Sequence, residues 1–200
     1  MDAHEDATIA FYAKEAGDYA KRARRQHHPK LQAFVDLLKP GAKVLELGCG
    51  DGQDSAFMLS CGLDVTPTDG CVELARLAEG RLCIPVAVLR FDALEAEDAF
   101  DGVWANACLL HVPMSALPDV LARVHRALTP GGIFYASYKA GDGEGRDKFG
   151  RYFNFPPREA LKRAYENAAG WRELNIAQSE GGGYDGVARM WLRVHARKAG

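Results

Sequence analysis

The segment from Lys43 to Gly52 constrains the fold of this chain more than any other part of the sequence. It reads Lys-Val-Leu-Glu-Leu-Gly-Cys-Gly-Asp-Gly, a mostly apolar run followed by three glycines at alternate positions. A continuous apolar run is typical of a buried parallel strand, and closely spaced glycines allow a tight turn from that strand into a helix. Unpaired amides at the start of this helix attract negative groups of a ligand. The segment therefore indicates the binding of a nucleoside-containing cofactor.

The glycine spacing distinguishes between two kinds of cofactor site. The dinucleotide fingerprint Gly-x-Gly-x-x-Gly would need a third glycine at position 53, where this chain has Gln53. Here an acid, Glu46, instead lies two residues before the first of three alternate glycines. The same turn also occurs in proteins without a ligand, so the interpretation depends on residues further along the chain.

Predicted strands and helices alternate through most of the sequence. The apolar patterns predict helices at 4–25, 29–38, 53–60, 71–78, 115–128 and 158–167, and strands at 43–47, 64–68, 86–89, 100–106 and 133–138. Two final strands, 172–179 and 190–196, are expected to pair antiparallel. Alternation of this kind indicates an α/β fold with a parallel sheet and right-handed crossovers. Ligands of such sheets bind beyond the carboxyl ends of the strands.

Acids follow the next two predicted strands. Asp69 ends the second strand just before Gly70, where a carboxylate can accept hydrogen bonds from both hydroxyls of a ribose. Asp92 follows the third strand, where it can accept from an adenine amino group while Phe91 or Ala93 lines the ring. Each acid alone can also be a helix cap or a solvated loop residue. Together with the acid of the first strand they favour an adenosyl cofactor.

These segments together resemble the class I S-adenosylmethionine-dependent methyltransferases over about residues 40–140. The resemblance extends to small bacterial members with a Leu-Leu-His-Val-Pro segment after strand four, here 109–113. It implies a Rossmann-like three-layer α/β/α sandwich whose mostly parallel seven-stranded sheet has an antiparallel last strand. It also implies S-adenosylmethionine as cofactor, S-adenosylhomocysteine as product, and cofactor contacts from Tyr12, Tyr19, Glu46, Gly48, Cys49, Gly50, Asp69, Gly70, Phe91, Asp92, Ala93, Asn106 and Ala107.

The resemblance assigns roles to some of these positions. Glu46 is expected near the methionine ammonium group, and Asn106 and Ala107 near the sulfonium. A tyrosine of the N-terminal helix is expected to reach the methionyl part, although Tyr12 and Tyr19 fit core packing equally well. The chain has Asn-Ala-Cys-Leu after strand four, without the Asn-Pro-Pro-Tyr or Asp-Pro-Pro-Tyr of enzymes that methylate DNA bases or protein glutamine.

The remaining candidate residues concern the acceptor of the methyl group. His111 follows strand four and titrates near neutrality, so it is the candidate catalytic base, with a structural turn residue as the alternative. The glycine-rich segment 140–157 is expected to act as a lid. Its Arg146 and Arg151 are candidates for binding an anionic group and Tyr152 for an apolar one, and a solvated surface loop is the alternative.

Composition limits the domain organisation and the partners. Two hundred residues suit one domain, residues 1–200, with a helical cap at 1–40. The net charge of −2, the lack of a long apolar run and the lack of a secretory signal favour a cytoplasmic protein, monomeric or homodimeric, that binds neither membrane nor nucleic acid. A basic cluster at 21–30 is read as a solvated helix face. Five scattered cysteines indicate reduced thiols, and no metal site is expected.

We therefore expect methyl transfer to a small-molecule acceptor. The alternatives are a tRNA or protein methyltransferase, which would use the basic cluster for docking, and a non-catalytic S-adenosylmethionine-binding protein.

Overall fold

A computed structural model describes residues 6–21, 29–182 and 186–200, without the side chains of Tyr19 and Ala20. Most of the predicted basic cluster, at 22–28, lies outside these residues. The helices are α1 (Asp6–Ala20), α2 (Pro29–Val35), α3 (Gln53–Ser60), α4 (Val72–Leu82), α5 (Leu117–Ala127) and α6 (Arg158–Ala168), with 3-10 turns η1 (Phe91–Ala93) and η2 (Leu109–His111). The strands are β1 (Lys43–Leu47), β2 (Asp64–Asp69), β3 (Ala87–Val88), β4 (Phe100–Ala105), β5 (Leu128–Lys139), β6 (Gly145–Arg146), β7 (Tyr152–Phe153), β8 (Trp171–Gly181) and β9 (Arg189–Lys198).

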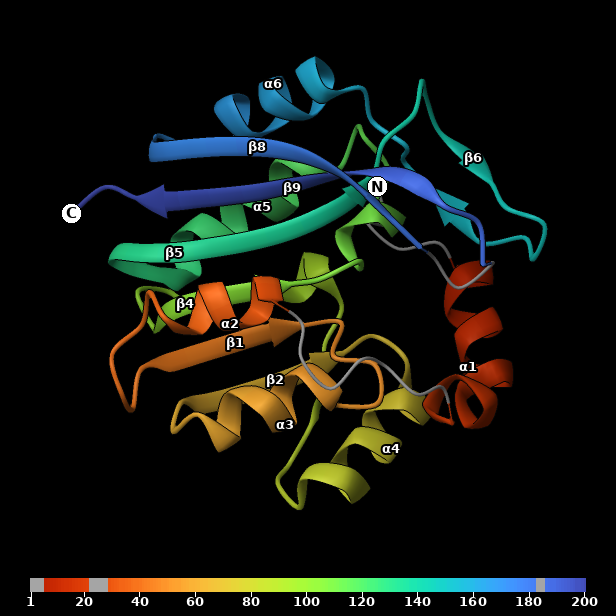
Figure 1. Cartoon of the computed structure of the whole chain (residues 1–200), viewed down its shortest axis with the longest axis horizontal. Helices are drawn as coiled ribbons and strands as arrows, with labels where there is room; N and C mark the ends of the chain where they lie inside the picture. The colour runs from red at the N-terminus through yellow and green to blue at the C-terminus, as the bar shows by residue number, and fades with distance from the viewer. Residues whose placement is uncertain (1–5, 22–28, 183–185) are drawn as a thin grey trace.

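Seven of these strands form one sheet in the order β3-β2-β1-β4-β5-β9-β8 (Figure 1). The first five strands of this order are parallel, and β9 lies antiparallel between β5 and β8. The predicted mostly parallel seven-stranded sheet is therefore confirmed, as is the antiparallel pairing of the two final strands. The strand order reverses direction between β1 and β4, so their carboxyl ends open the crevice where sheets of this kind bind ligands.

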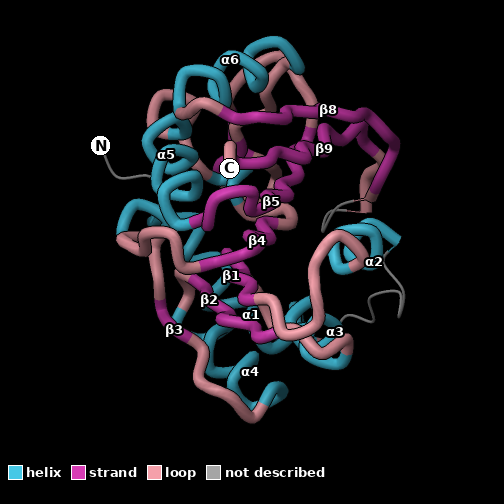
Figure 2. The backbone as a smooth tube through the Cα atoms, turned by 90° about the vertical axis from the view of Figure 1, so that its left-hand side faces the viewer, coloured by secondary structure: helices cyan, strands magenta, loops and turns pink. Residues whose placement is uncertain are grey.

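Helices cover both faces of the sheet (Figure 2). On one face α5 buries four apolar residues at helical spacing, Leu117, Val120, Leu121 and Val124. On the opposite face, Phe34 of α2 packs on Trp104, which stacks on Tyr135 with ring centroids 4.0 Å apart. This packing buries the middle of the sheet and leaves the carboxyl ends of the strands to the loops.

The boundary between α5 and β5 differs from the prediction. The sequence predicted a helix to Leu128, a Pro-Gly-Gly turn and a strand from Ile133, but β5 begins at Leu128 directly after α5. Gly131 has a left-handed φ of +78°, and the pairing of β5 with β4 shifts register nearby. A left-handed glycine lets a strand bulge and continue, so residues that alone predict a turn remain in the sheet here.

Other predicted boundaries need smaller corrections. Helix α2 ends at Val35 and not Leu38, α4 continues to Leu82, and β3 has only two residues. The segment 140–157, expected as a glycine-rich lid with a surface loop as the alternative, contains the β6–β7 hairpin, in which Gly145 pairs with Phe153. This hairpin matters for the site because its second strand reaches the loop after β4.

Three further observations limit the chemistry. Among the described residues, no helix combines the length and hydropathy that a membrane span requires. The same residues contain no group of three potential metal ligands placed to hold an ion. All five cysteines are free, and three of them, Cys49, Cys71 and Cys108, are buried.

Candidate functional site

The glycine loop after β1 adopts a conformation that requires its glycines. Gly48, Gly50 and Gly52 have φ angles of +65°, +61° and +81°, a region that other residues rarely adopt. A Cβ atom on Gly48 would lie 2.5 Å from the Cβ of Cys108, so a larger residue cannot fit there. The loop therefore packs its backbone directly against the segment that follows β4.

Asp69 fastens this loop to the end of β2. One carboxylate oxygen accepts from the backbone amide of Gly50 at 2.8 Å and the other from the amide of Cys71 at 2.8 Å. Burial raises the pKa of Asp69 to about 6, although both amides act in the opposite direction. An ionised carboxylate has about four acceptor positions, so two remain for a ligand.

Glu46 is the second buried acid of the site. Its carboxylate accepts a hydrogen bond from the hydroxyl of Ser55 in α3, and its backbone carbonyl accepts from Thr68 of β2 at 2.8 Å. The Cys49 thiol, next to the loop, has a raised pKa because of burial and then because of the negative charges of Glu46 and Asp69. This cysteine is therefore a neutral thiol and a poor nucleophile.

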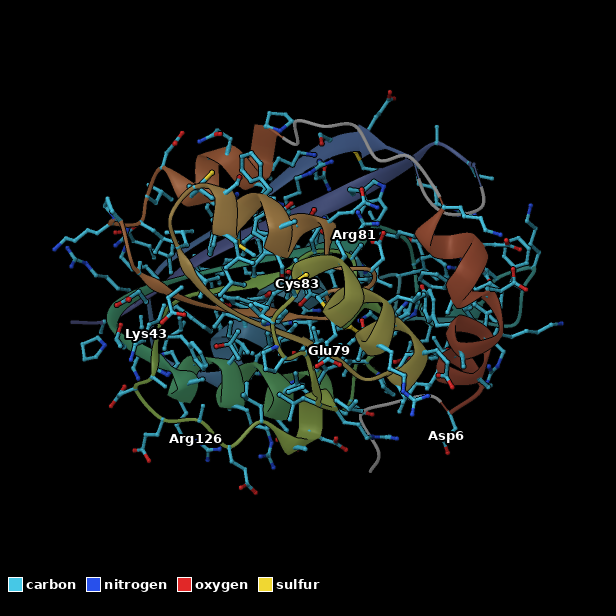
Figure 3. All side chains as sticks on the ribbon, turned by 90° about the horizontal axis from the view of Figure 1, so that it is seen from below. Asp6, Lys43, Glu79, Arg81, Cys83 and Arg126 are labelled. Carbon is cyan, nitrogen blue, oxygen red and sulfur yellow. The ribbon has the colours of Figure 1, made fainter. Side chains whose placement is uncertain are left out.

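The far side of the loop is held by α4. Arg81, near the end of α4 (Figure 3), donates to the backbone and the carboxylate of Asp51 at 2.8 and 2.9 Å. Gln53 donates to the same carboxylate at 2.7 Å. Asp51 thus orients the start of α3, a role that the sequence analysis did not assign.

The adenine-side candidates lie together in the turn η1. Phe91 is buried in the core, whereas Asp92 is partly exposed and lies 3.8 Å from the guanidinium of Arg90. Arg90 also lies 3.4 Å from Asp6 at the start of α1. Asp92 is therefore beside a cation at the edge of the site, in a less enclosed position than Asp69.

Asn106 and Ala107 are held by residues that the sequence analysis missed. The Asn106 amide donates to Asp54 of α3 at 3.2 Å and accepts from Ser137 of β5 at 2.8 Å. The backbone amide of Ala107, which has a φ of +57°, donates to the same Ser137 hydroxyl at 2.9 Å. The polar Ser137 inside the apolar run of β5 was the available signal for this contact. The sequence alone did not show that its hydroxyl faces the residues after β4.

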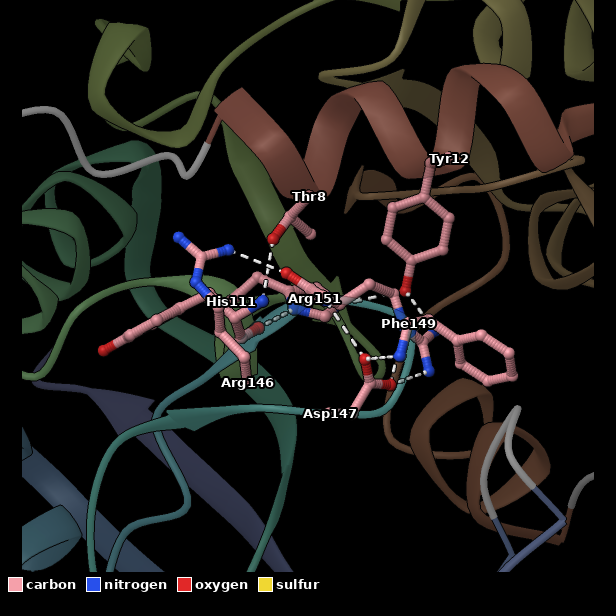
Figure 4. Close-up of polar contacts among 9 residues, drawn as sticks. Thr8, Tyr12, His111, Arg146, Asp147, Phe149 and Arg151 are labelled. Carbon is pink, nitrogen blue, oxygen red and sulfur yellow. Dashed lines mark hydrogen bonds and ion pairs between the residues drawn. The ribbon is translucent and has the colours of Figure 1, made fainter.

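His111 lies in a buried cluster that joins three distant segments (Figure 4). Its Nδ1 is 2.6 Å from the carbonyl oxygen of Tyr152, and its Nε2 is 3.0 Å from the hydroxyl of Tyr12. Since a carbonyl can only accept, Nδ1 carries the proton and Nε2 accepts from Tyr12. Burial lowers the pKa of His111 to about 3, and the charges of Arg151 and Lys139 add to this effect. The ring is therefore neutral near pH 7.

Arg151 supplies the charge at the centre of this cluster. Only 1% of the residue is exposed, and its guanidinium binds the carboxylate of Asp147 at 2.6 Å and the hydroxyl of Tyr12 at 3.1 Å (Figure 4). The expectation that Arg151 holds an anionic acceptor group does not fit this geometry, because Asp147 already neutralises it. Arg146 is exposed and donates to the carbonyl of Gly150 at 2.7 Å.

The same cluster ties α1 to the segment 140–157. The Tyr152 amide donates to the Thr8 hydroxyl at 2.9 Å, and the rings of Phe11 and Phe149 lie 5.6 Å apart. The Tyr152 hydroxyl donates to Glu144 at 2.5 Å. Tyr12 thus reaches His111 as part of one packed unit, while the side chain of Tyr19 lies outside the described residues.

Replacing Gly48 with alanine should disrupt the loop. A Cβ at this position combines an unfavourable φ with a clash against Cys108, so we expect the free energy of unfolding to fall by about 2–4 kcal/mol. The control is Gly62→Ala, which has a φ of +80° but open space around the added Cβ, with an expected loss of about 1 kcal/mol. Urea denaturation measures both, and equal losses would refute the role of the close approach.

Replacing Arg151 with methionine should destabilise the protein strongly. The change leaves the Asp147 carboxylate buried without its cation, which typically costs about 3–5 kcal/mol. Arg146→Met, an exposed position in the same hairpin, should change stability by less than about 0.5 kcal/mol. Thermal or urea unfolding of the two variants compares them directly, and a stable Arg151→Met protein would argue against the buried pair as the link between α1 and the hairpin.

Comparison with curated proteins identifies relatives that cover part of the chain. The chain is 33% identical over 101 residues to an uncharacterised methyltransferase of Synechocystis, covering 48% of this chain and 47% of the relative. It is 35% identical over 108 residues to a ubiquinone biosynthesis O-methyltransferase of Xanthomonas campestris, covering 49% of this chain and 43% of the relative. The chain thus spans about half the length of the curated relatives it matches.

Solved structures share the fold over nearly the whole chain. The 1,6-didemethyltoxoflavin-N1-methyltransferase of Burkholderia thailandensis superposes with a TM-score of 0.76 at 24% identity, covering 98% of this chain and 88% of that one. A methyltransferase of Methanosarcina mazei gives a TM-score of 0.74 at 20% identity, covering 86% of this chain and 98% of that one. A family model described as a methyltransferase domain matches residues 19–174, well over half of the sequence. This chain belongs to the methyltransferase-domain family.

Proposed function

We propose that this protein is an S-adenosylmethionine-dependent methyltransferase that acts on a small-molecule acceptor. The observation that carries the proposal is the buried carboxylate of Asp69, which holds the glycine loop at the carboxyl end of β2. Membership of the methyltransferase-domain family supports the reaction type. The names of relatives that act in ubiquinone biosynthesis or on didemethyltoxoflavin support a small acceptor.

The residues of the loop fit an adenosyl cofactor. Asp69 keeps two acceptor positions for the ribose hydroxyls, and the Gly48 backbone allows close approach. We assign Glu46 to the methionine ammonium side and Asp92, with Phe91 and Ala93, to the adenine. The further assigned contacts are Tyr12, Tyr19, Cys49, Gly50, Gly70, Asn106 and Ala107. When bound, S-adenosylmethionine supplies the methyl group from its sulfonium.

The cap over the site consists of α1 and the segment 140–157. Both are joined by Tyr12, Arg151 and the Tyr152 backbone, so we treat them as one covering unit within a single domain. We assign the exposed Arg146 and the Tyr152 ring to its acceptor-facing side. A cover of this kind excludes water and holds the reacting groups in line, which is most of what methyl transfer requires.

His111 is assigned as the acceptor of a proton. Its Nε2 lone pair points to the Tyr12 hydroxyl, so a proton that reaches the Tyr12 oxygen can be passed to Nε2. A pKa of about 3 makes the imidazole a weak base. Such a base still suffices for an oxygen acceptor, because an alcohol or phenol becomes strongly acidic as its oxygen gains a methyl group. The assignment therefore favours O-methylation.

Binding of S-adenosylhomocysteine should depend on the ionisation of Asp69. Ribose hydroxyls donate to the ionised carboxylate, and burial raises its pKa to about 6, so the protonated form must lose a proton to bind. We expect the affinity to rise about tenfold from pH 5 to pH 7 and then to level off. Without ligand, the folding stability depends on pH in the opposite direction, because the folded state holds the Asp69 proton more tightly than the unfolded state does. Stability from Asp69 therefore falls as the pH rises from about 4 to 6.

Calorimetric titration with S-adenosylhomocysteine across this pH range measures the effect. Asp69→Asn should weaken binding at pH 7 and remove the pH dependence. Asp64→Asn, at the exposed beginning of the same strand, should keep both affinity and pH dependence. If Asp69→Asn bound as tightly as the wild type, the assignment of the cofactor to this loop would fail.

Replacing His111 with alanine tests the proton-transfer role. We expect turnover with an oxygen acceptor to fall about a hundredfold while S-adenosylhomocysteine still binds within threefold of the wild type. The assay is a methyl-donor screen across hydroxylated metabolites, followed by kinetics on the best acceptor. His125→Ala, in α5 beside Trp171, is the matched control and should keep full turnover. Full turnover of His111→Ala would leave His111 as a structural residue only.

A further inference from the structure

One face of β9 carries an unusual series of polar side chains. Antiparallel partners share a face, and on this face Arg193 lies opposite Ser137 of β5. Three other residues of β9 point to the opposite face and belong to the apolar core: Leu192, Val194 and Ala196. The alternate positions of the other face are Arg189, Trp191, Arg193, His195 and Arg197, of which Trp191 also packs within the apolar core. The sheet therefore presents cations on the side covered by α2.

Among the described residues, no acid forms an ion pair with Arg193. It is 8% exposed, its Nη1 donates to the carbonyl of Ser179 at 3.4 Å, its side chain also interacts with the Tyr135 hydroxyl, and it forms no ion pair within the described part of the chain. An arginine stays charged when buried, so an uncompensated one costs stability. Arg197 on the same face differs, because it lies 3.7 Å from Glu173 and donates to the Gly131 carbonyl at 3.2 Å.

A second buried donor, the Trp191 indole N–H, lies near Arg193. The Trp191 indole Nε1 is buried and has no hydrogen-bond partner among the described residues. A Cβ built on Gly181 would lie 2.8 Å from Trp191 Cδ1, 3.0 Å from Trp191 Nε1 and 3.5 Å from Arg193 Nη2, so the indole and the guanidinium both pack close to Gly181 and to each other. Buried donors without partners are rare in folded proteins and indicate a bound water, ion or ligand that completes the bonding.

The surrounding charges make the shortage of acceptors more marked. Burial and then the positive charge of Arg193 lower the pKa of Lys30, which begins α2 on this face. Burial raises the pKa of Tyr135 to about 12, and the charge of Arg193 and hydrogen bonds from Ser137 and Arg193 oppose this rise. The nearby acid Asp54 is occupied by Trp104 and Asn106 at 2.9 and 3.2 Å. The face around Arg193 is therefore electropositive and rich in donors.

This face is close to the proposed methyl-transfer position. Ser137, opposite Arg193, binds both Asn106 and Ala107, which we assign to the sulfonium side. Neighbouring strands lie about 5 Å apart, so the backbones of Arg193 and Asn106, which are two strands apart, are separated by about 10 Å. That distance suits the two ends of one small acceptor molecule.

We propose that the methyl acceptor carries an oxyanion, a carboxylate or a phosphate, that binds between the Arg193 guanidinium and the Trp191 indole N–H. The inference rests on the proposed methyltransferase function, because it assigns this anion to the acceptor. A planar guanidinium can donate two parallel bonds to such a group, and a charge-assisted pair of this kind is strong and selective. Arg193 then determines acceptor specificity, a role that the sequence analysis assigned to Arg146 and Arg151.

Nitrogen-15 NMR of the three tryptophan indole groups tests the proposal, with benzoate and inorganic phosphate as probes. Each anion is titrated with and without S-adenosylhomocysteine, and Trp191→Phe assigns the Trp191 signal. We expect a saturable shift of the Trp191 indole signal with at least one anion. The preferred probe distinguishes a carboxylate subsite from a phosphate subsite. Arg193→Met should weaken that binding at least tenfold, and Arg197→Met should change it less than twofold.

Two further measurements separate the possible outcomes. Arg193→Met should keep S-adenosylhomocysteine affinity within twofold and should not lower Tm, since it removes an unbalanced buried charge. An unmoved Trp191 signal, or a shift that persists in Arg193→Met, would overturn the inference. A large loss of S-adenosylhomocysteine affinity in Arg193→Met would also overturn it, because the anion would then be the cofactor's own carboxylate. Failure of the wild type to bind S-adenosylhomocysteine would refute the proposed function, and the anion titrations without this ligand would still test the oxyanion site separately.

Discussion

The double hydrogen bond from the Gly50 and Cys71 amides to the Asp69 carboxylate is the interaction on which the rest of the site depends. It fixes the end of β2 against the glycine loop of β1 at the point where the strand order reverses. The left-handed φ of Gly48 and its contact with Cys108 then bring the segment after β4 to the same place. Three strands are thus joined through backbone groups, and the carboxylate keeps acceptor positions for a ligand.

Three buried basic side chains of the described structure differ in how their charge is balanced. Arg151 is balanced by Asp147, and this pair holds Tyr12 so that α1 and the hairpin pack as one unit. His111 avoids charge altogether, because burial and nearby cations keep its ring neutral. Arg193 is buried and forms no ion pair with an acid in the part of the chain that the structure describes. Local departures from good packing and pairing tend to mark functional positions, which is why the third case is the informative one.

The sequence predicted the sheet and the cofactor loop well because both depend on short-range signals. Apolar runs placed β1 and β4 within one residue, and the alternate glycines located the loop. The acids at strand ends followed from the topology of parallel sheets. The boundary at Leu128 was wrong, because a Pro-Gly-Gly turn pattern was overridden by pairing with β4.

The acceptor side was harder to predict because it depends on contacts between distant segments. A glycine-rich, charged run at 140–157 gives no sign that Arg151 pairs with Asp147 or that Tyr12 lies against His111. The sequence also could not predict that Arg193 is buried without an ion pair among the described residues, since an arginine in a strand usually reaches solvent or an acid. Its meaning depends on the strand order, which places β9 beside β5.

The central claim is that an adenosyl cofactor binds at the end of β2 through Asp69. The most direct measurement is a crystal structure of the protein grown with S-adenosylhomocysteine. The account predicts both ribose hydroxyls within about 3 Å of the Asp69 carboxylate, with the amides of Gly50 and Cys71 still bonded to it. An adenosine moiety bound elsewhere, with Asp69 covered by protein atoms, would contradict it.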